Sequence, residues 1–146
     1  MTLANHLLTG AAIAKILPLP FAIPLALVSH FILDALPHFG FKSYEERQKR
    51  QKLWLYVIAL DLITAILLTA WLISSNHTKW LLVGMVAYSP DLIWIYRFIV
   101  KEKFGKVAPH KGNLFIQFHS GIQKYERTWG GAIELAYAAV MFLFVR

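Results

Sequence analysis

The stretch Ser29-His30-Phe31-Ile32-Leu33-Asp34-Ala35-Leu36-Pro37-His38 stands at the end of a long apolar run that begins at Phe21. The run indicates a membrane-spanning or deeply buried helix, yet it carries an imidazole and a carboxylate. His30 and Asp34 are four residues apart, which puts them on one face of a helix, one turn apart. This spacing suits two ligands of one metal ion. An ion pair or a helix-packing hydrogen bond is the alternative. Pro37 can end the helix just before His38.

The composition favours a membrane protein. Of the 146 residues, 58% are apolar and only 16% are charged, against a usual charged share of about 25%. The formal net charge is +7, but the basic residues gather in polar segments rather than on a helical face. They therefore indicate topology and contact with lipid headgroups, and no nucleic-acid partner is expected. The absence of cysteine excludes thiolate catalysis, cysteine-type zinc sites and disulfides.

Apolar segments recur along the chain, and alternation of period two is nowhere sustained, so no sheet is expected. The first segment, Leu7–Leu17, is too short to cross a hydrocarbon core of about 30 Å. It is expected to be re-entrant or to pack as a half-helix, forming a hairpin with the segment Phe21–Phe39. Three full spans are expected at Leu53–Ile73, Trp80–Val100 and Thr128–Val145. The sequence thus predicts one all-α domain, residues 1–146, folded as an integral membrane helical bundle; a soluble all-α protein with a very apolar core is the alternative.

Two basic segments, Gly40–Lys52 and Lys101–Arg127, should both face the cytoplasm by the positive-inside rule. The short polar turn Ser74–Lys79 then lies outside, and the protein is expected in the inner (cytoplasmic) membrane as a multi-pass protein. At about 1.5 Å of rise per residue, several polar groups fall roughly 7–13 Å from the inner ends of their helices. These groups are His30, Asp34, Asp61, Asp91 and Glu134.

Half of the eight carboxylates lie inside apolar segments: Asp34, Asp61, Asp91 and Glu134. A carboxylate at the centre of a span costs on the order of 2.5–3.5 kcal/mol, so four of them need cations. A divalent metal would balance the charge and use neutral histidines as ligands. Zinc is the first choice and manganese or iron the alternatives, with one or two ions. The candidate metal ligands are His6, His30, Asp34, Asp61, Asp91 and His119, and the candidate catalytic bases are Asp61 and Glu134.

The same residues have structural alternatives. Asp61 could be a protonated carboxyl bonded to a neighbouring helix. Asp91 could cap a helix that Pro90 breaks. Glu134 could be a ligand, a base or the partner of an arginine, and His38 could be a ligand or could contact one. His77 and His110 are expected to be ordinary loop histidines.

Three motifs resemble a known family. Asn5-His6-Leu7-Leu8-Thr9-Gly10-Ala11-Ala12 looks like the Thr/Asn-His-x-x-x-Gly opening of the bacterial inner-membrane metal-dependent hydrolase family of YdjM type. His30 to His38 and Ser89-Pro90-Asp91 resemble its histidine and small-Pro-Asp signatures, and Phe118 to Glu134 looks like the tail of related membrane proteins. The ordered set of His, Asp and Glu is also similar in type to the zinc-dependent phospholipase C and S1/P1 nuclease group, all-helical enzymes with multi-zinc clusters that act on phosphate esters. The chain lacks the family's His-Arg-Gly-x-Thr-His-Ser segment.

These observations predict a membrane-embedded metal-dependent hydrolase with its metal centre near the cytoplasmic face. The expected substrate is a phosphate ester or another anionic, lipid-like molecule, gathered by the basic segments. The expected partners are the lipid bilayer and such a substrate, with a homo-oligomer as a further option. Two other classes stay open: a small ion, metal or proton-coupled carrier, which would also need intramembrane carboxylates and a broken helix, and a non-catalytic membrane assembly protein.

Overall fold

The computed structural model describes residues 1–101, 103 and 113–146, and all regular structure in these residues is helical, as predicted. Short 3-10 turns, η1 and η3, and one π-turn, η2, join or extend the α-helices. His110 and the middle of the second basic segment lie outside the described residues. The elements are α1 (Leu3–Ile16), α2 (Leu19–Asp34), α3 (Tyr44–Lys49), α4 (Gln51–Ser74), α5 (Thr78–Tyr88), η1 (Ser89–Asp91), α6 (Leu92–Tyr96), η2 (Arg97–Lys101), α7 (Leu114–Ile122), η3 (Gln123–Tyr125) and α8 (Gly130–Val145).

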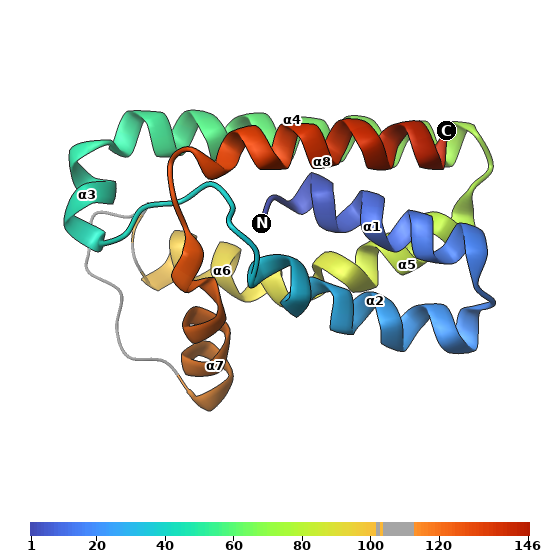
Figure 1. The fold of residues 1–146 in the computed structure, drawn as a ribbon, viewed down its shortest axis with the longest axis horizontal. Helices are drawn as coiled ribbons and strands as arrows, with labels where there is room; N and C mark the ends of the chain where they lie inside the picture. Colours follow the sequence, from blue (N-terminus) through green and yellow to red (C-terminus); the bar gives the residue numbers. More distant parts are fainter. Residues whose placement is uncertain (102, 104–112) are drawn as a thin grey trace.

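The first helix lies at the centre of the bundle. Figure 1 shows α1 between a layer formed by α4 and α8 and a layer formed by α2 and α5. Every residue from Ala4 to Ala12 is buried, as expected for an apolar helix with neighbours on all sides. Of the two alternatives for this short segment, the structure shows the helix packed on its neighbours.

The backbones of α1 and α5 are in direct contact where Gly10 meets Gly84. A Cβ atom on Gly10 would lie 2.5 Å from Gly84 Cα, and a Cβ atom on Gly84 would lie 2.8 Å from the carbonyl oxygen of Leu7. Small residues at a helix crossing permit such a close approach. The crossing brings the helix that carries His6 against the helix that leads to Asp91.

The second helix ends earlier than the sequence suggested. Its last residue is Asp34 rather than Phe39. Pro37 follows closely, and a proline disfavours the helical conformation of the residue before it. The chain then leaves the bundle and forms an isolated parallel bridge between His38 and Glu126. Asp34 therefore stands at the carboxyl end of α2, beside the segment that leads into α8.

Two helical stretches in the described chain have the length and composition to cross a membrane. They are Gln51–Ser74 and Thr78–Lys101, of 24 residues each, and they match the predicted spans Leu53–Ile73 and Trp80–Val100. The predicted break in the second stretch is confirmed, because η1 interrupts it with a 3-10 turn.

The third predicted span, Thr128–Val145, is shorter in the structure. The helix α8 begins at Gly130 and has 16 residues, which gives a length of about 24 Å against a hydrocarbon core of about 30 Å. A close contact fixes its start, since a Cβ atom on Gly130 would lie 2.3 Å from the carbonyl oxygen of His38. Within the described residues, two helical stretches rather than three therefore have spanning length.

The α1–α5 contact gives a test of the packing. Gly10→Ala should lower the free energy of unfolding by about 1–3 kcal/mol. The added methyl group meets backbone atoms, which cannot move aside as a flexible side chain can. Gly121→Ala on α7 is the matched control, since nothing lies within 4 Å of its Cβ position. Thermal unfolding in detergent, followed by circular dichroism, measures both. Equal melting temperatures for the two variants would contradict the crossing described here.

Candidate metal centre

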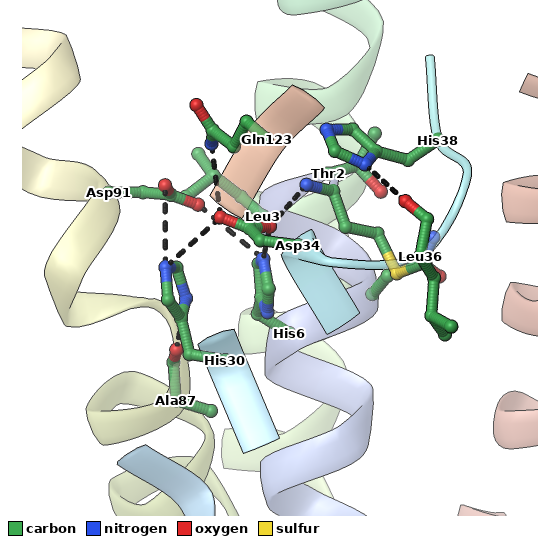
Figure 2. A network of polar contacts seen from close by, with 12 residues as sticks. Thr2, Leu3, His6, His30, Asp34, Leu36, His38, Ala87, Asp91 and Gln123 are labelled. Atoms are coloured by element: carbon green, nitrogen blue, oxygen red, sulfur yellow. Dashed lines mark hydrogen bonds and ion pairs between the residues drawn. The ribbon is translucent and has the colours of Figure 1, made fainter. Parts of the chain in front are cut away.

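Four buried side chains bring their ligand atoms within 4.8 Å of one another: His30, Asp34, Asp91 and His119. They come from α2, η1 and α7, so distant parts of the chain build the group together. All four were predicted as metal ligands. Figure 2 shows His30 and Asp34 from α2 facing Asp91 from the broken helix.

Local structure explains how each element delivers its ligand. One turn of α2 separates His30 from Asp34, as predicted, and leaves His30 Nε2 3.4 Å from Asp34 Oδ2. The 3-10 turn at Ser89–Asp91 carries Asp91 into the same space. His119 lies in the last turn of α7, a helix capped by the Asn113 side chain, which accepts a hydrogen bond from the Ile116 amide at 3.1 Å.

The distances between donor atoms lie on both sides of those around a small divalent ion, so modest side-chain shifts would suffice to bind one. Ligands at about 2.0–2.2 Å in tetrahedral geometry stand roughly 3.3–3.6 Å apart. Asp91 Oδ1 lies 3.7 Å from His30 Nε2 and 3.8 Å from His119 Nε2. The two imidazole Nε2 atoms lie 3.1 Å apart, and His119 Nε2 lies 2.7 Å from Asp34 Oδ2. Two imidazoles and two carboxylates without sulfur suit zinc, manganese or iron.

The hydrogen bond at His30 Nδ1 leaves the Nε2 atom, which faces the cluster, able to bind a cation. His30 Nδ1 lies 2.9 Å from the carbonyl oxygen of Ala87, and a carbonyl oxygen only accepts, so Nδ1 carries the proton. In the neutral ring Nε2 then presents a lone pair to the cluster. A backbone carbonyl in this position is the usual way in which a protein fixes the orientation of a ligating histidine.

At His119 the hydrogen bond at Nδ1 runs the other way, because this nitrogen accepts a hydrogen bond instead of donating one. Trp94 Nε1 is only a donor and lies 3.1 Å from His119 Nδ1, so the neutral ring carries its proton on Nε2 and donates it to Asp34. A metal ion at Nε2 requires that proton to leave. If the ring proton then sits on Nδ1, it faces the Trp94 N–H, and two donors cannot share a hydrogen bond. Metal binding through Nε2 is therefore incompatible with the Trp94–His119 hydrogen bond.

His6 lies on the other side of the two carboxylates. Its Nε2 atom is 3.1 Å from Asp34 Oδ1 and 3.6 Å from Asp91 Oδ2, and its ring stacks on His30 with centroids 4.2 Å apart. Asp34 and Asp91 thus each direct one oxygen toward His6 and the other toward His30 and His119. The structure places His6 beside the group of four rather than within it, and its role as a metal ligand stays a prediction.

Two further groups contact Asp34. The α-amino group of Met1 forms a buried ion pair with Oδ1, and the Gln123 side-chain amide donates to Oδ2 at 3.0 Å. Burial by itself lowers the pKa of the Met1 amine, but the negative charges of Asp34 and Asp91 outweigh this effect and hold the pKa above its usual value. The charged amine offsets part of the carboxylate charge.

Trp94 was not predicted at the site, and Gln123 was noted only as part of the Phe118–Glu134 tail, although both stand at helical spacing from predicted ligands. Gln123 is four residues after His119, and Trp94 is three residues after Asp91. Residues at these separations share a helix face. The spacing could therefore have identified both as contacts of the site.

The structure gives Asp61 and Glu134 different surroundings from the other candidates, and neither belongs to the group of four. Asp61 accepts hydrogen bonds from the backbone amides of Leu3 and Ala4 at 2.8 and 3.0 Å. Glu134 accepts from the Thr2 amide at 2.8 Å. The Thr2 side chain makes no capping hydrogen bond, so carboxylates from α4 and α8 satisfy the first amides of α1 instead.

The remaining histidines in the described chain lie outside the group. His38 is buried in the loop after α2, with Nδ1 2.7 Å from the carbonyl oxygen of Leu36 and Nε2 3.7 Å from Glu126. His77 precedes α5 and stacks on Trp80 at 3.8 Å, as expected of a loop histidine.

Comparisons with protein-family models, with curated proteins and with solved structures found no match. The resemblance to the inner-membrane hydrolase family stays a prediction, and the function is inferred from the site.

Zinc titration of metal-free protein should show saturable binding and a change in tryptophan emission. The emission should change because the Trp94 indole loses its bond to His119, and Trp94→Phe should remove most of the change while zinc still binds. Asp34→Asn and His119→Gln should weaken binding by about tenfold or more, whereas the control His77→Gln should bind as wild type. Undiminished binding in His119→Gln would remove His119 from the ligand set.

The capping role of Asp61 can be separated from a ligand or catalytic role. Asp61→Asn should lower stability by about 1 kcal/mol, because the amide keeps one acceptor for two backbone N–H groups, and Asp61→Ala should lower it further. Zinc content per folded protein should be the same in Asp61→Asn and wild type. Loss of zinc at unchanged stability would instead support the ligand role that the sequence predicted.

Proposed function

We propose that this protein is a membrane-embedded metal-dependent hydrolase that acts on a phosphate ester or a similar anionic, lipid-like substrate. The observation that carries the proposal is the buried group of two imidazoles and two carboxylates. Asp34 supports it as well, because a carboxylate at the carboxyl end of a helix is unfavourable without nearby cations. The Met1 amine pairs with its Oδ1 atom, while Oδ2 faces His30 and His119.

The chain's own residues supply binding and orientation at this centre. His30, Asp34, Asp91 and His119 would hold one ion. A second ion at His6 and the outer oxygens of the two carboxylates would have to displace the Met1 amine from Asp34 Oδ1. The Ala87 carbonyl and the Gln123 amide fix the orientation of His30 and Asp34. A divalent ion in such a site polarises a phosphoryl oxygen and activates water for attack. Zinc is the proposed ion, with manganese or iron as alternatives.

The outer surface of the helices supports a membrane location. Large apolar side chains of α4 point outward, and Leu60, Ile66 and Leu67 are 62%, 65% and 64% exposed. Soluble monomers rarely expose contiguous apolar patches of more than a few hundred Å². A lipid bilayer would cover this surface.

The arrangement of the ends supports the proposed topology. In Figure 1, α3 and α7 lie at one end of the bundle, while the α4–α5 turn and the C-terminus lie at the other. The basic residues of α3 and of the flanking segments therefore share one end with α7. By the positive-inside rule this end would face the cytoplasm, and the protein would be a multi-pass protein of the inner membrane.

A carrier is the second candidate, and the break in the second long helix at Ser89–Asp91 favours it. Broken helices with polar groups at the break are typical of ion and substrate sites in transporters. Metal flux and hydrolysis are measured separately, so one preparation tests both.

The zinc-loaded protein in detergent should hydrolyse bis(p-nitrophenyl) phosphate or dioleoyl phosphatidic acid in mixed micelles. Asp34→Asn and Asp91→Asn should lower kcat/KM by about 100-fold or more, because removal of a ligand charge weakens metal binding and transition-state stabilisation together. His77→Gln is the matched control and should keep full activity. A zinc-loaded protein that cleaves neither ester but moves zinc across liposome membranes would overturn the hydrolase in favour of the carrier.

A further inference from the structure

A cavity of about 860 Å³ is lined in part by residues of α3 and α7, two helices that lie at one end of the molecule (Figure 1). The loop after α2, the start of α4, the α6–η2 segment and the α7–η3 segment form its walls. Its charged lining residues in the described chain are five cations and one carboxylate: Lys42, Arg47, Arg97, Lys124, Arg127 and Glu126. The carboxylate lies 3.7 Å from His38 Nε2. Among the described lining residues, positive charge is therefore in excess.

Aromatic side chains hold two of these cations in place. The Arg47 guanidinium lies 4.6 Å from the centre of the Trp54 ring, and the Arg97 guanidinium lies 5.4 Å from that of Trp94. A guanidinium stacked on a ring keeps its N–H groups in the plane, where they suit a phosphate. The Trp54 ring also packs edge-on against Phe98, 4.9 Å away, so one wall of the cavity is rigid and apolar.

The cavity shares two residues with the metal centre. Trp94 lines the cavity and donates to His119, and Gln123 lines the cavity and donates to Asp34. A ligand in the cavity would therefore lie against groups that contact two of the candidate metal ligands. Long-range attraction by the cations would also raise the local concentration of an anion at this end.

We infer that this cavity binds the phosphate or pyrophosphate monoester group of the substrate and presents it to the metal centre. That the bound ligand is then hydrolysed rests on the proposed function, whereas its binding in the cavity does not. The same chemistry occurs in a lipid headgroup and in a soluble phosphate, and the volume leaves room for more than one phosphoryl group. Trp54 and Phe98 would contact the apolar part of the ligand next to its headgroup.

The test measures binding to the full chain in a neutral detergent, with and without zinc, by calorimetry. The probes are inorganic pyrophosphate and dihexanoyl phosphatidic acid. Wild type should bind in both metal states, and the double variant Lys42→Gln/Lys124→Gln should bind about tenfold more weakly, because two charge-assisted contacts are lost. Both lysines are exposed and neither contacts the metal cluster, so zinc content should not change.

The matched control is Lys49→Gln/Lys79→Gln, which removes the same charge from two exposed lysines that do not line the cavity. It should change the affinity less than about twofold, since exposed charges at a distance are largely screened by salt. The single variants Lys42→Gln and Lys124→Gln replace the double variant if it fails to fold, and each should show a smaller loss in the same direction.

The outcomes separate the cavity from the hydrolase. If pyrophosphate binds, the cavity recognises the anion alone. If phosphatidic acid binds and pyrophosphate does not, the cavity recognises the anion together with the apolar group next to it. Either result supports the site. Binding without hydrolysis by zinc-loaded protein would overturn the hydrolase and leave the site standing. Absence of binding by both probes, or equal weakening in the control pair, would overturn the site.

Discussion

The charge of the buried Asp34 carboxylate must be compensated, and this requirement holds several elements of the bundle together. Asp34 stands at the carboxyl end of α2, where the helix dipole opposes a negative charge, and it is shielded from water. It contacts side chains or groups from the N-terminus, α1, α2, α7 and η3: the Met1 amine, His6, His30, His119 and Gln123. A buried charge is tolerated only with such compensation, so this one residue ties together elements that are distant in sequence.

The position of α1 is the second constraint. Close packing at Gly10 and Gly84 puts α1 in the middle of the bundle, and this places His6 beside the two aspartates. The amides at the start of α1 then need acceptors in an apolar environment, and Asp61 and Glu134 provide them. Two of the four carboxylates in apolar segments thus serve the helix that carries His6, and two belong to the group that could hold a metal ion.

The sequence predicted the parts of the site that depend on local spacing. The His30–Asp34 pair follows from the helical repeat, and the break that delivers Asp91 follows from Pro90. The all-helical fold and the closeness of His6 and His119 to these residues were also predicted. The groups that Asp61 and Glu134 contact could not be predicted from the sequence. An apolar helix with one carboxylate has the same sequence pattern whether that carboxylate faces a metal or the amides of another helix. The length of the last helix depends on a contact between Gly130 and the His38 backbone, which no local pattern contains.

X-ray absorption spectroscopy at the zinc edge of the purified, zinc-loaded protein identifies the atoms that bind the ion. A centre built from these four residues should show nitrogen and oxygen ligands at about 2.0–2.2 Å with the multiple-scattering signature of about two imidazoles per ion, and no sulfur. His30→Ala should lower the imidazole contribution. A spectrum with oxygen ligands alone, or a protein that retains no zinc after desalting, would contradict a metal centre built from His30, Asp34, Asp91 and His119.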